Sequence, residues 1–213
     1  MSAVLTDILK NACLDSAVAG APGSALFLGL HTAPGQAGAE VTGGSPAYAR
    51  KAITWQAAGA VTQGAKDITA SVTFDIPAGT TVRSVGLWSA STAGTLRAWS
   101  PAGASARRSF TVTAAGVTAN TIDSPGHGLV AGNSVLVWPT IGAVLPTGLA
   151  EDTEYFVIAA GLTTDVFSLS ATLGGSAIDI TAIGDGDVQK FTPEVFAGQG
   201  TYQVTTFTVS FPG

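Results

Sequence analysis

The sequence predicts an all-β protein: a β-sandwich of jelly-roll or immunoglobulin-like type, with a short N-terminal helix and a small inserted β-domain. Apolar and polar residues alternate along most of the chain, and turn residues interrupt these runs at short intervals. Hydrophobic residues make up 46% of the 213 residues and charged residues only 11%, so the chain can bury a core. The two sandwich types leave similar patterns, so both stay open.

A single apolar stripe predicts a helix over Ser2 to Val18. Its members recur every three or four residues: Val4, Leu5, Ile8, Leu9, Ala12 and Cys13. Gly20 and Pro22 follow the stripe and are expected to end the helix.

The period then changes to two, which indicates strands. The strands predicted for the main domain cover residues 25–30, 48–55, 71–76, 81–89, 95–99, 110–112 and 201–211. The alternation is clearest where Val72, Phe74 and Ile76 face one way and polar residues the other. We therefore expect a sandwich built from residues 1–112 and 191–213.

Turn signals become regular beyond Ala114, and the last of them is Gly184-Asp185-Gly186. Short strands are predicted between these turns at residues 134–138, 154–158, 166–170 and 177–181. Residues 113–190 are therefore expected to form the inserted domain. A surface loop tolerates such an insertion because the entropy of loop closure grows slowly with loop length.

The charge pattern excludes several classes of function. The net charge is −5, and the nine Lys and Arg residues form no run beyond Arg50-Lys51 and Arg107-Arg108, so nucleic-acid binding is not expected. No membrane span is expected, and no signal peptide, which points to synthesis in a host cytoplasm. Cys13 is the only cysteine and cannot form an internal disulfide. A surface poor in charge is easily buried against a partner, which favours an assembly component.

No catalytic residue, cofactor or metal site is predicted. His31 and His127 lack the nucleophile and carboxylate that a general base needs, so we expect the ring nitrogens of His31 to tie down the following loop and His127 to serve a turn. Asp185 and Asp187, with Asp179 nearby, offer a calcium site as an alternative to a hairpin turn with exposed acids. We favour the turn, because the full calcium-loop spacing is missing.

Three tryptophans are the candidate glycan-binding or interface residues: Trp88, Trp99 and Trp138. Trp88 and Trp99 are one step out of phase with the core positions beside them, so at least one is expected to face outwards. Packing is favoured over sugar stacking, because large aromatic residues dominate cores and interfaces.

The stretch Leu30-His31-Thr32-Ala33-Pro34-Gly35, residues 38–44, and Tyr48-Ala49-Arg50-Lys51-Ala52-Ile53-Thr54-Trp55 together resemble a family of small phage proteins, the tail-fibre-like or minor tail proteins. This resemblance covers about residues 5–112 and the closing strand. The inserted part, which includes Tyr155-Phe156-Val157-Ile158 and Asp179-Ile180-Thr181, resembles a β-repeat of phage tail and fibre proteins.

The resemblance implies a non-enzymatic component of a tailed-phage virion, located in the tail, that packs against copies of itself or other virion proteins. A symmetric homo-oligomer is expected, most simply a trimer. Two alternatives stay open: a decoration protein on the capsid surface, and a module that holds a host surface glycan through the inserted domain.

Overall fold

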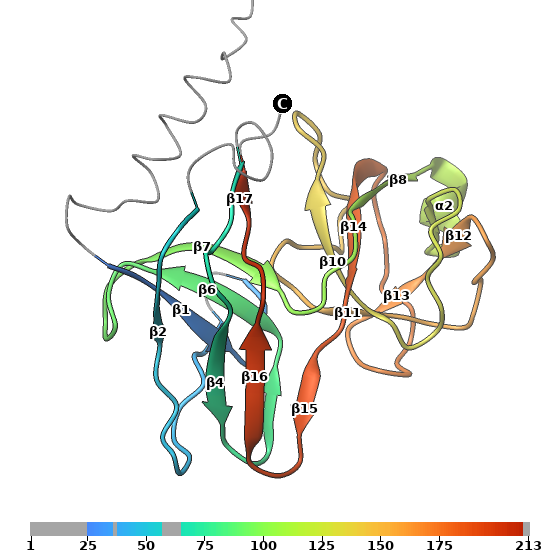
Figure 1. The fold of residues 1–213 in the computed structure, drawn as a ribbon. Coiled ribbons are helices and arrows are strands. Elements are labelled where there is room, and N and C mark those ends of the chain that lie inside the picture. Colours follow the sequence, from blue (N-terminus) through green and yellow to red (C-terminus); the bar gives the residue numbers. More distant parts are fainter. Residues whose placement is uncertain (1–24, 36–37, 57–64, 211–213) are drawn as a thin grey trace, which may run out of the picture. The chain divides into compact units, whose positions relative to one another are not determined.

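The computed structural model describes residues 25–35, 38–56 and 65–210 (Figure 1). The described chain consists of strands β1 to β17 and one short helix, α2, so the predicted all-β sandwich class is confirmed. The helix predicted over residues 2–18 lies outside the described residues. The chain divides into two compact units: the first comprises residues 1–32, 39–100 and 195–213, and the second comprises residues 33–38 and 101–194.

The first unit contains a four-stranded sheet in the order β2-β1-β6-β7. Its strands are β2 (Lys51–Ile53), β1 (Leu26–His31), β6 (Ser84–Trp88) and β7 (Leu96–Pro101). The two faces of this sheet differ in character. One face carries buried aliphatic side chains: Leu26, Leu28, Leu30, Ile53, Val85 and Leu87. The other face carries Phe27, Gly29 and His31 of β1, directly opposite Trp88, Gly86 and Ser84 of β6.

The C-terminal part of the first unit pairs with three strands that are distant in sequence. The pairs are β15 (Glu194–Phe196) with β5 (Thr80–Val82), β16 (Gly200–Val204) with β4 (Val72–Ile76), and β17 (Val209–Ser210) with β3 (Ala65–Lys66). Figure 1 shows β4 and β16 side by side, crossing the direction of the four-stranded sheet. The carboxylate of Asp67 accepts the backbone N–H groups of Ile68 and Phe207, the latter at 2.7 Å, and so fixes the returning chain to the end of β3.

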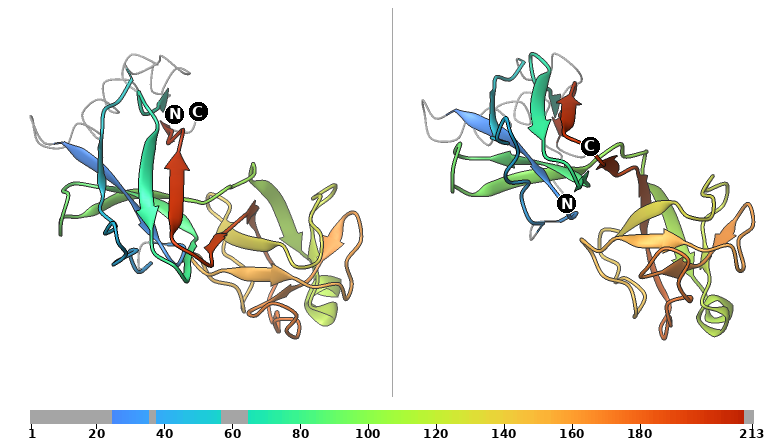
Figure 2. Two further views of the ribbon diagram at one scale, coloured as in Figure 1. Left: turned by 60° about the horizontal axis from the view of Figure 1, so that its bottom comes forward. Right: turned by 90° about the horizontal axis from the view of Figure 1, so that it is seen from below.

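The second unit contains a seven-stranded sheet in the order β12-β9-β8-β14-β10-β11-β13, and Figure 2 gives two further views of it. Its strands are β12 (Val166–Phe167), β9 (Ile122–Asp123), β8 (Arg108–Val112), β14 (Gly184–Phe191), β10 (Ser134–Pro139), β11 (Tyr155–Val157) and β13 (Leu169–Ser170). Only Ser168 separates β12 from β13, although they form opposite edges of the sheet. The segment predicted as one strand over 166–170 therefore belongs to both edges and nearly closes the sheet into a barrel.

An apolar cluster of buried residues fills this barrel. It consists of Phe110, Val112, Ile122, Leu129, Val135, Val137, Leu149, Tyr155, Val157, Phe167, Leu169, Ile180 and Val188. The members on β8, β10 and β11 recur at every second residue, which follows from the alternation of side chains along a strand.

The turn predicted at residues 184–186 is wrong, because these residues begin β14, the longest strand of the described chain. Glycine is required within this strand: a Cβ on Gly186 would lie 2.5 Å from the carbonyl oxygen of Trp138 and 2.6 Å from the ring of Phe110. Local turn chemistry was therefore a poor guide here, since tertiary packing sets the residue type.

Several predicted boundaries also differ. The second compact unit includes Pro101–Glu194 and therefore β8, which pairs with β14, whereas the predicted inserted domain covers residues 113–190. Residues 177–181 form no strand and make single bonds such as that from Ile178 N–H to the Leu169 carbonyl. The predicted strand 81–89 is divided between β5 and β6 at Arg83, whose N–H donates to the carbonyl of His31.

The short helix α2 (Ala114–Ala119) was not predicted. Thr113 caps its N-terminus by accepting the Gly116 N–H, and Asn120 ends it in the left-handed conformation. Both residues are typical of helix ends. Within the described residues, no helix is long and apolar enough to cross a membrane.

Candidate functional site

Polar side chains gather on the face of the four-stranded sheet that lies opposite its aliphatic core. We call this group the polar network; it consists of His31, Glu40, Tyr48, Arg50 and Trp88. Two glycines that face each other across β1 and β6 make room for it. A Cβ on Gly29 would lie 3.0 Å from Glu40 Oε1, and a Cβ on Gly86 would lie 2.6 Å from His31 Cε1. The strands therefore carry glycine where the network packs on the backbone.

The Arg50–Glu40 ion pair is the centre of the polar network. Arg50 Nε donates to Glu40 Oε1 and Arg50 Nη2 donates to Glu40 Oε2, both at 2.7 Å. This fork-to-fork geometry is the strongest that an arginine and a carboxylate can form. The arginine side chain is only 6% exposed and the glutamate side chain 25%, so the pair is largely shielded from water.

The remaining donors of Arg50 fix the turn between β6 and β7. Its Nη1 donates to the carbonyl of Ala90 at 2.9 Å and to that of Ala93 at 2.5 Å. Its guanidinium carbon lies 3.6 Å from the ring centre of Trp88, a cation–π contact. One arginine therefore joins the loop that carries Glu40 to the turn after β6.

His31 is fully buried at the end of β1. Its Nε2 accepts the indole N–H of Trp88 at 3.2 Å, and its Nδ1 has no hydrogen-bond partner among the described residues. Burial lowers the pKa of His31 below its usual value, the charge of Arg50 lowers it further, and Glu40 acts in the opposite direction. The ring is thus held neutral, as an acceptor for Trp88.

Tyr48 connects the network to β1. Its hydroxyl accepts the N–H of Leu30 at 2.6 Å and donates to Glu40 Oε1 at 3.1 Å. Burial is the main cause that raises the pKa of Tyr48, so the hydroxyl keeps the proton that it donates. The ring stacks on Phe74, with centroids 6.0 Å apart.

This geometry orients backbone segments and leaves His31 without the partners of a general base. Neither ring nitrogen of His31 is hydrogen-bonded to a hydroxyl or a carboxylate, because one accepts from Trp88 and the other is unpartnered in the described chain. A nucleophile–base pair needs such a bond. The network therefore acts as a clamp that fixes the sheet, the Glu40 loop and the β6–β7 turn.

The prediction that the ring nitrogens of His31 hydrogen-bond the loop that follows it is wrong. One ring nitrogen bonds Trp88 on β6, whereas the loop is closed by Thr32, whose N–H and hydroxyl both donate to the carbonyl of Ala39. His127 does serve a turn, because its Nδ1 accepts the N–H of Leu129 at 2.9 Å.

The three candidate tryptophans lie on three different strands. Trp88 belongs to the polar network, Trp99 is half-buried on β7, and Trp138 is buried on β10 of the second unit. Guanidinium groups cover a face of two of them: Arg50 lies over Trp88, and Arg107 lies 3.9 Å from the ring centre of Trp138. Those covered faces do not offer a stacking platform for a sugar.

Two of the three acids considered as a calcium site, Asp185 and Asp187, lie on β14 and accept hydrogen bonds from hydroxyls of β8. Thr111 donates to Asp185 at 2.7 Å and Ser109 donates to Asp187 at 3.1 Å. Among the residues that the structure describes, no group of three His, Cys, Asp or Glu side chains could hold a metal ion.

Sequence reasoning missed Glu40 and Arg50 as partners, although both lie in or beside the motif that it singled out. The available signal was the pair of glycines inside two apolar strands, Gly29 and Gly86, since an internal strand glycine often marks close approach of another group. The charges of Glu40 and Arg50 gave a second signal, because charged residues are rare in this chain.

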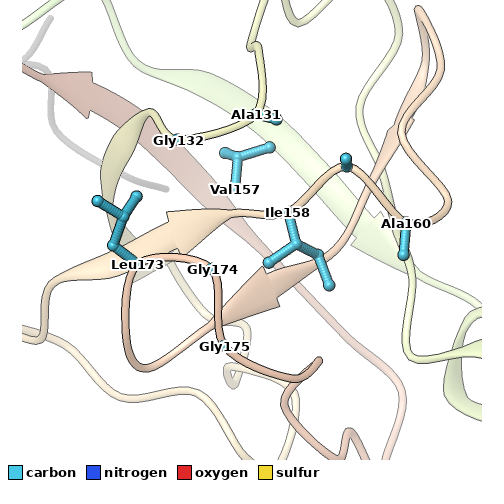
Figure 3. A pocket seen from close by; sticks show the side chains of 9 residues that line it. Ala131, Gly132, Val157, Ile158, Ala160, Leu173, Gly174 and Gly175 are labelled. Atoms are coloured by element: carbon cyan, nitrogen blue, oxygen red, sulfur yellow. The ribbon is translucent and has the colours of Figure 1, made fainter.

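Shallow hollows lie on both units. Beside Glu40 and Arg50 a hollow of about 340 Å³ is bordered by Thr42, Tyr48 and Thr92. On the barrel, a hollow of about 510 Å³ is bordered by Gly132, Ile158 and Leu173, and its side chains are all apolar (Figure 3). The barrel hollow therefore offers no side-chain polar group that could orient a ligand.

Residues 1–123 match the family described as Podophage GP4 fiber I protein gp80. This match covers more than half of the chain. The protein belongs to this phage fibre family. The coarse prediction of a phage structural protein is thereby confirmed. No curated protein and no solved structure matches the chain.

The fibre-family match contains the whole polar network and all four strands of the first sheet, and it ends at Asp123 in β9. Most strands of the barrel follow this point. The part of this fibre protein that the family describes is therefore centred on the first unit.

Proposed function

We propose that this fibre-family protein is a subunit of the phage tail that works by packing against copies of itself and against other virion proteins. The observation that carries the proposal is the open sheet of the first unit. Its outer strands, β2 and β7, each have one neighbour within the described chain. An open edge presents unpaired N–H and C=O groups that can pair with another chain.

Strand β7 is the better candidate for this pairing. It has six residues, whereas β2 has three, and a longer edge can form more main-chain bonds. Trp99 lies on β7 and is half-buried within the described chain, and large aromatic residues are common at protein–protein interfaces. The low charge of the whole sequence also reduces the cost of desolvating such an edge.

The oligomer is expected to be a trimer, because a fibre needs repeated identical contacts around an axis. Light scattering on the full chain at tens of micromolar tests this expectation. A mass three times that of the monomer supports the proposal. A monomer that also fails to join virions in an infection contradicts it.

Two proline substitutions test the edge directly. Adjacent residues of a strand point their N–H groups to opposite sides, so Arg97→Pro and Ala98→Pro remove one donor towards β6 and one from the open edge of β7. The variant that keeps the circular dichroism spectrum of the parent has lost the outer donor, and we expect it to be monomeric. If it assembles like the parent, the edge is not the contact.

The number of copies in purified particles tests the tail location. A count between a handful and a few dozen is expected, whereas hundreds of copies would indicate a decoration protein on the capsid surface. Quantitative mass spectrometry of particles against a known capsid protein gives this ratio.

A further inference from the structure

Two cations lie at the mouth of the barrel, at one end of its apolar interior. Phe110 and Val112 of β8 belong to the apolar cluster, and the two-residue period places Arg108 on the same face. Val188 of β14 lies opposite Arg108, and Lys190 follows it on the same face, opposite Val135 of β10. Diagonal neighbours of this kind have β-carbons about 7–8 Å apart, so both long side chains can reach one ligand.

Both side chains border a hollow of about 290 Å³ together with Ser105 and His127. No acidic residue borders this hollow. In the part of the chain that the structure describes, neither Arg108 nor Lys190 has an ion-pair partner. Two like charges at one barrel mouth repel each other, and a bound anion would offset this repulsion.

His127 supplies a third, independent indication. Its side chain is buried, with 5% exposed, and its Nδ1 accepts the N–H of Leu129. In the neutral ring the proton is therefore on Nε2, which has no acceptor among the described residues. An unpaired buried donor destabilises the fold, because it has lost its hydrogen bond to water and gained none in return. A ligand oxygen that accepted this hydrogen would remove that destabilisation.

We propose that this hollow binds a small oxyanion, a carboxylate or phosphate group. The planar guanidinium of Arg108 would bind two ligand oxygens, the ammonium of Lys190 would add a point charge, and His127 would donate from Nε2. The hollow is slightly smaller than the pockets of about 300–1,000 Å³ that hold drug-sized ligands, so the group is carried by a molecule of about one sugar unit. This role lies beyond packing in the virion and does not depend on it.

Titration of the full chain with glucuronate and with glucose 1-phosphate tests the proposal and separates the two sources of charge. We expect saturable binding of at least one acid, with a shift of the Leu129 amide signal in an NMR spectrum, and no binding of neutral glucose. The absence of saturation with both acids up to tens of millimolar would overturn the proposal, and so would equal binding of glucose.

Arg108→Gln and Lys190→Gln are each expected to weaken binding at least tenfold. Arg107→Gln is the matched control, because it removes the same charge from the next residue, whose guanidinium lies over Trp138 instead of lining the hollow. If Arg107→Gln weakens binding as much as Arg108→Gln, the effect is general electrostatics and the site does not exist. Equal affinity in Arg108→Gln and the parent would contradict the proposal as well.

Discussion

The two units differ in whether the edge strands of their main sheet are open or brought together. The first unit has a four-stranded sheet whose outer strands each have one neighbour among the described residues, and its C-terminal segment forms three separate two-stranded pairs. In the second unit the consecutive strands β12 and β13 nearly close a seven-stranded sheet into a barrel. An open edge can bind another chain through its backbone, whereas a closed barrel can bind only through side chains on its surface or at its mouth. This contrast is the reason why we propose assembly through the first unit and small-ligand binding by the second.

The units also differ in what holds them together. The barrel depends on a continuous apolar cluster. The first unit has, behind its aliphatic face, a shielded ion pair with a histidine, a tyrosine and a tryptophan around it. Apolar packing tolerates many rearrangements, but a buried ion pair is satisfied in one geometry only. We therefore expect the first unit to be more sensitive to polar substitutions and the barrel to lost volume.

The largest effect is expected in the barrel. Phe167 is fully buried in β12 and its ring packs edge-on against His127, so Phe167→Ala should lower the free energy of unfolding by about 4 kcal/mol. Hydrogen exchange should show lost protection in peptides from residues 101–194. The control Leu173→Ala removes a side chain that is 69% exposed and should have little effect. An equal loss of protection in both units would remove the contrast between them.

The next effect is expected in the polar network. Arg50→Ala leaves Glu40 without its partner in a largely shielded position and frees two carbonyl groups, so a loss of about 3 kcal/mol is expected in urea unfolding. Arg50→Lys keeps the charge but not the fork and should be intermediate. Arg97→Ala, at an exposed position on β7, is the matched control. If Arg50→Ala and Arg97→Ala cost the same, the ion pair contributes nothing to the first unit.

A smaller effect is expected where the network packs on the backbone. Gly86→Ala places a methyl group 2.6 Å from His31 Cε1 and 2.7 Å from Leu96 Cδ1, and forcing these groups apart should cost about 2 kcal/mol. Gly198→Ala meets no atom within 4 Å and is the control. Thermal unfolding of the two variants compares them. A parent-like melting temperature for Gly86→Ala would show that the network moves aside without loss.

The alternation of apolar and polar residues correctly predicted the strands that bury one face in a core. Strands β1, β4 and β10 lie where the pattern placed them, because each carries apolar residues that pack in a core. Strand β14 was missed because its Gly and Asp residues favour turns locally, while its position between β8 and β10 depends on contacts with residues far away in sequence. Prediction from local residue types therefore fails where contacts with neighbouring strands determine which residue types a strand can carry.

The candidate sites were harder to predict for a related reason. His31 and Trp88 are separated by 57 positions, and they meet only because β1 and β6 pair in one register. Arg108 and Lys190 are brought together in the same way by β8 and β14. The sequence gives no register before the partners are known, so the tryptophans could be named as candidates but not placed.

The subtlest test of the contrast uses the acid response of the first unit. Burial lowers the pKa of His31 below its usual value of about 6.5. Between the lowered pKa and about pH 6.5, the unfolded chain therefore binds a proton at His31 and the folded chain does not. His31 therefore contributes to a loss of stability as the pH falls through about 6.5, and the contribution levels off below the lowered pKa. Gln in place of His31 would still accept the Trp88 N–H but would not titrate. His31→Gln should thus give a shallower decline of the urea midpoint between pH 7 and pH 5. Because both proteins share all other titrating groups, parallel declines would mean that the buried ring does not couple the first unit to pH.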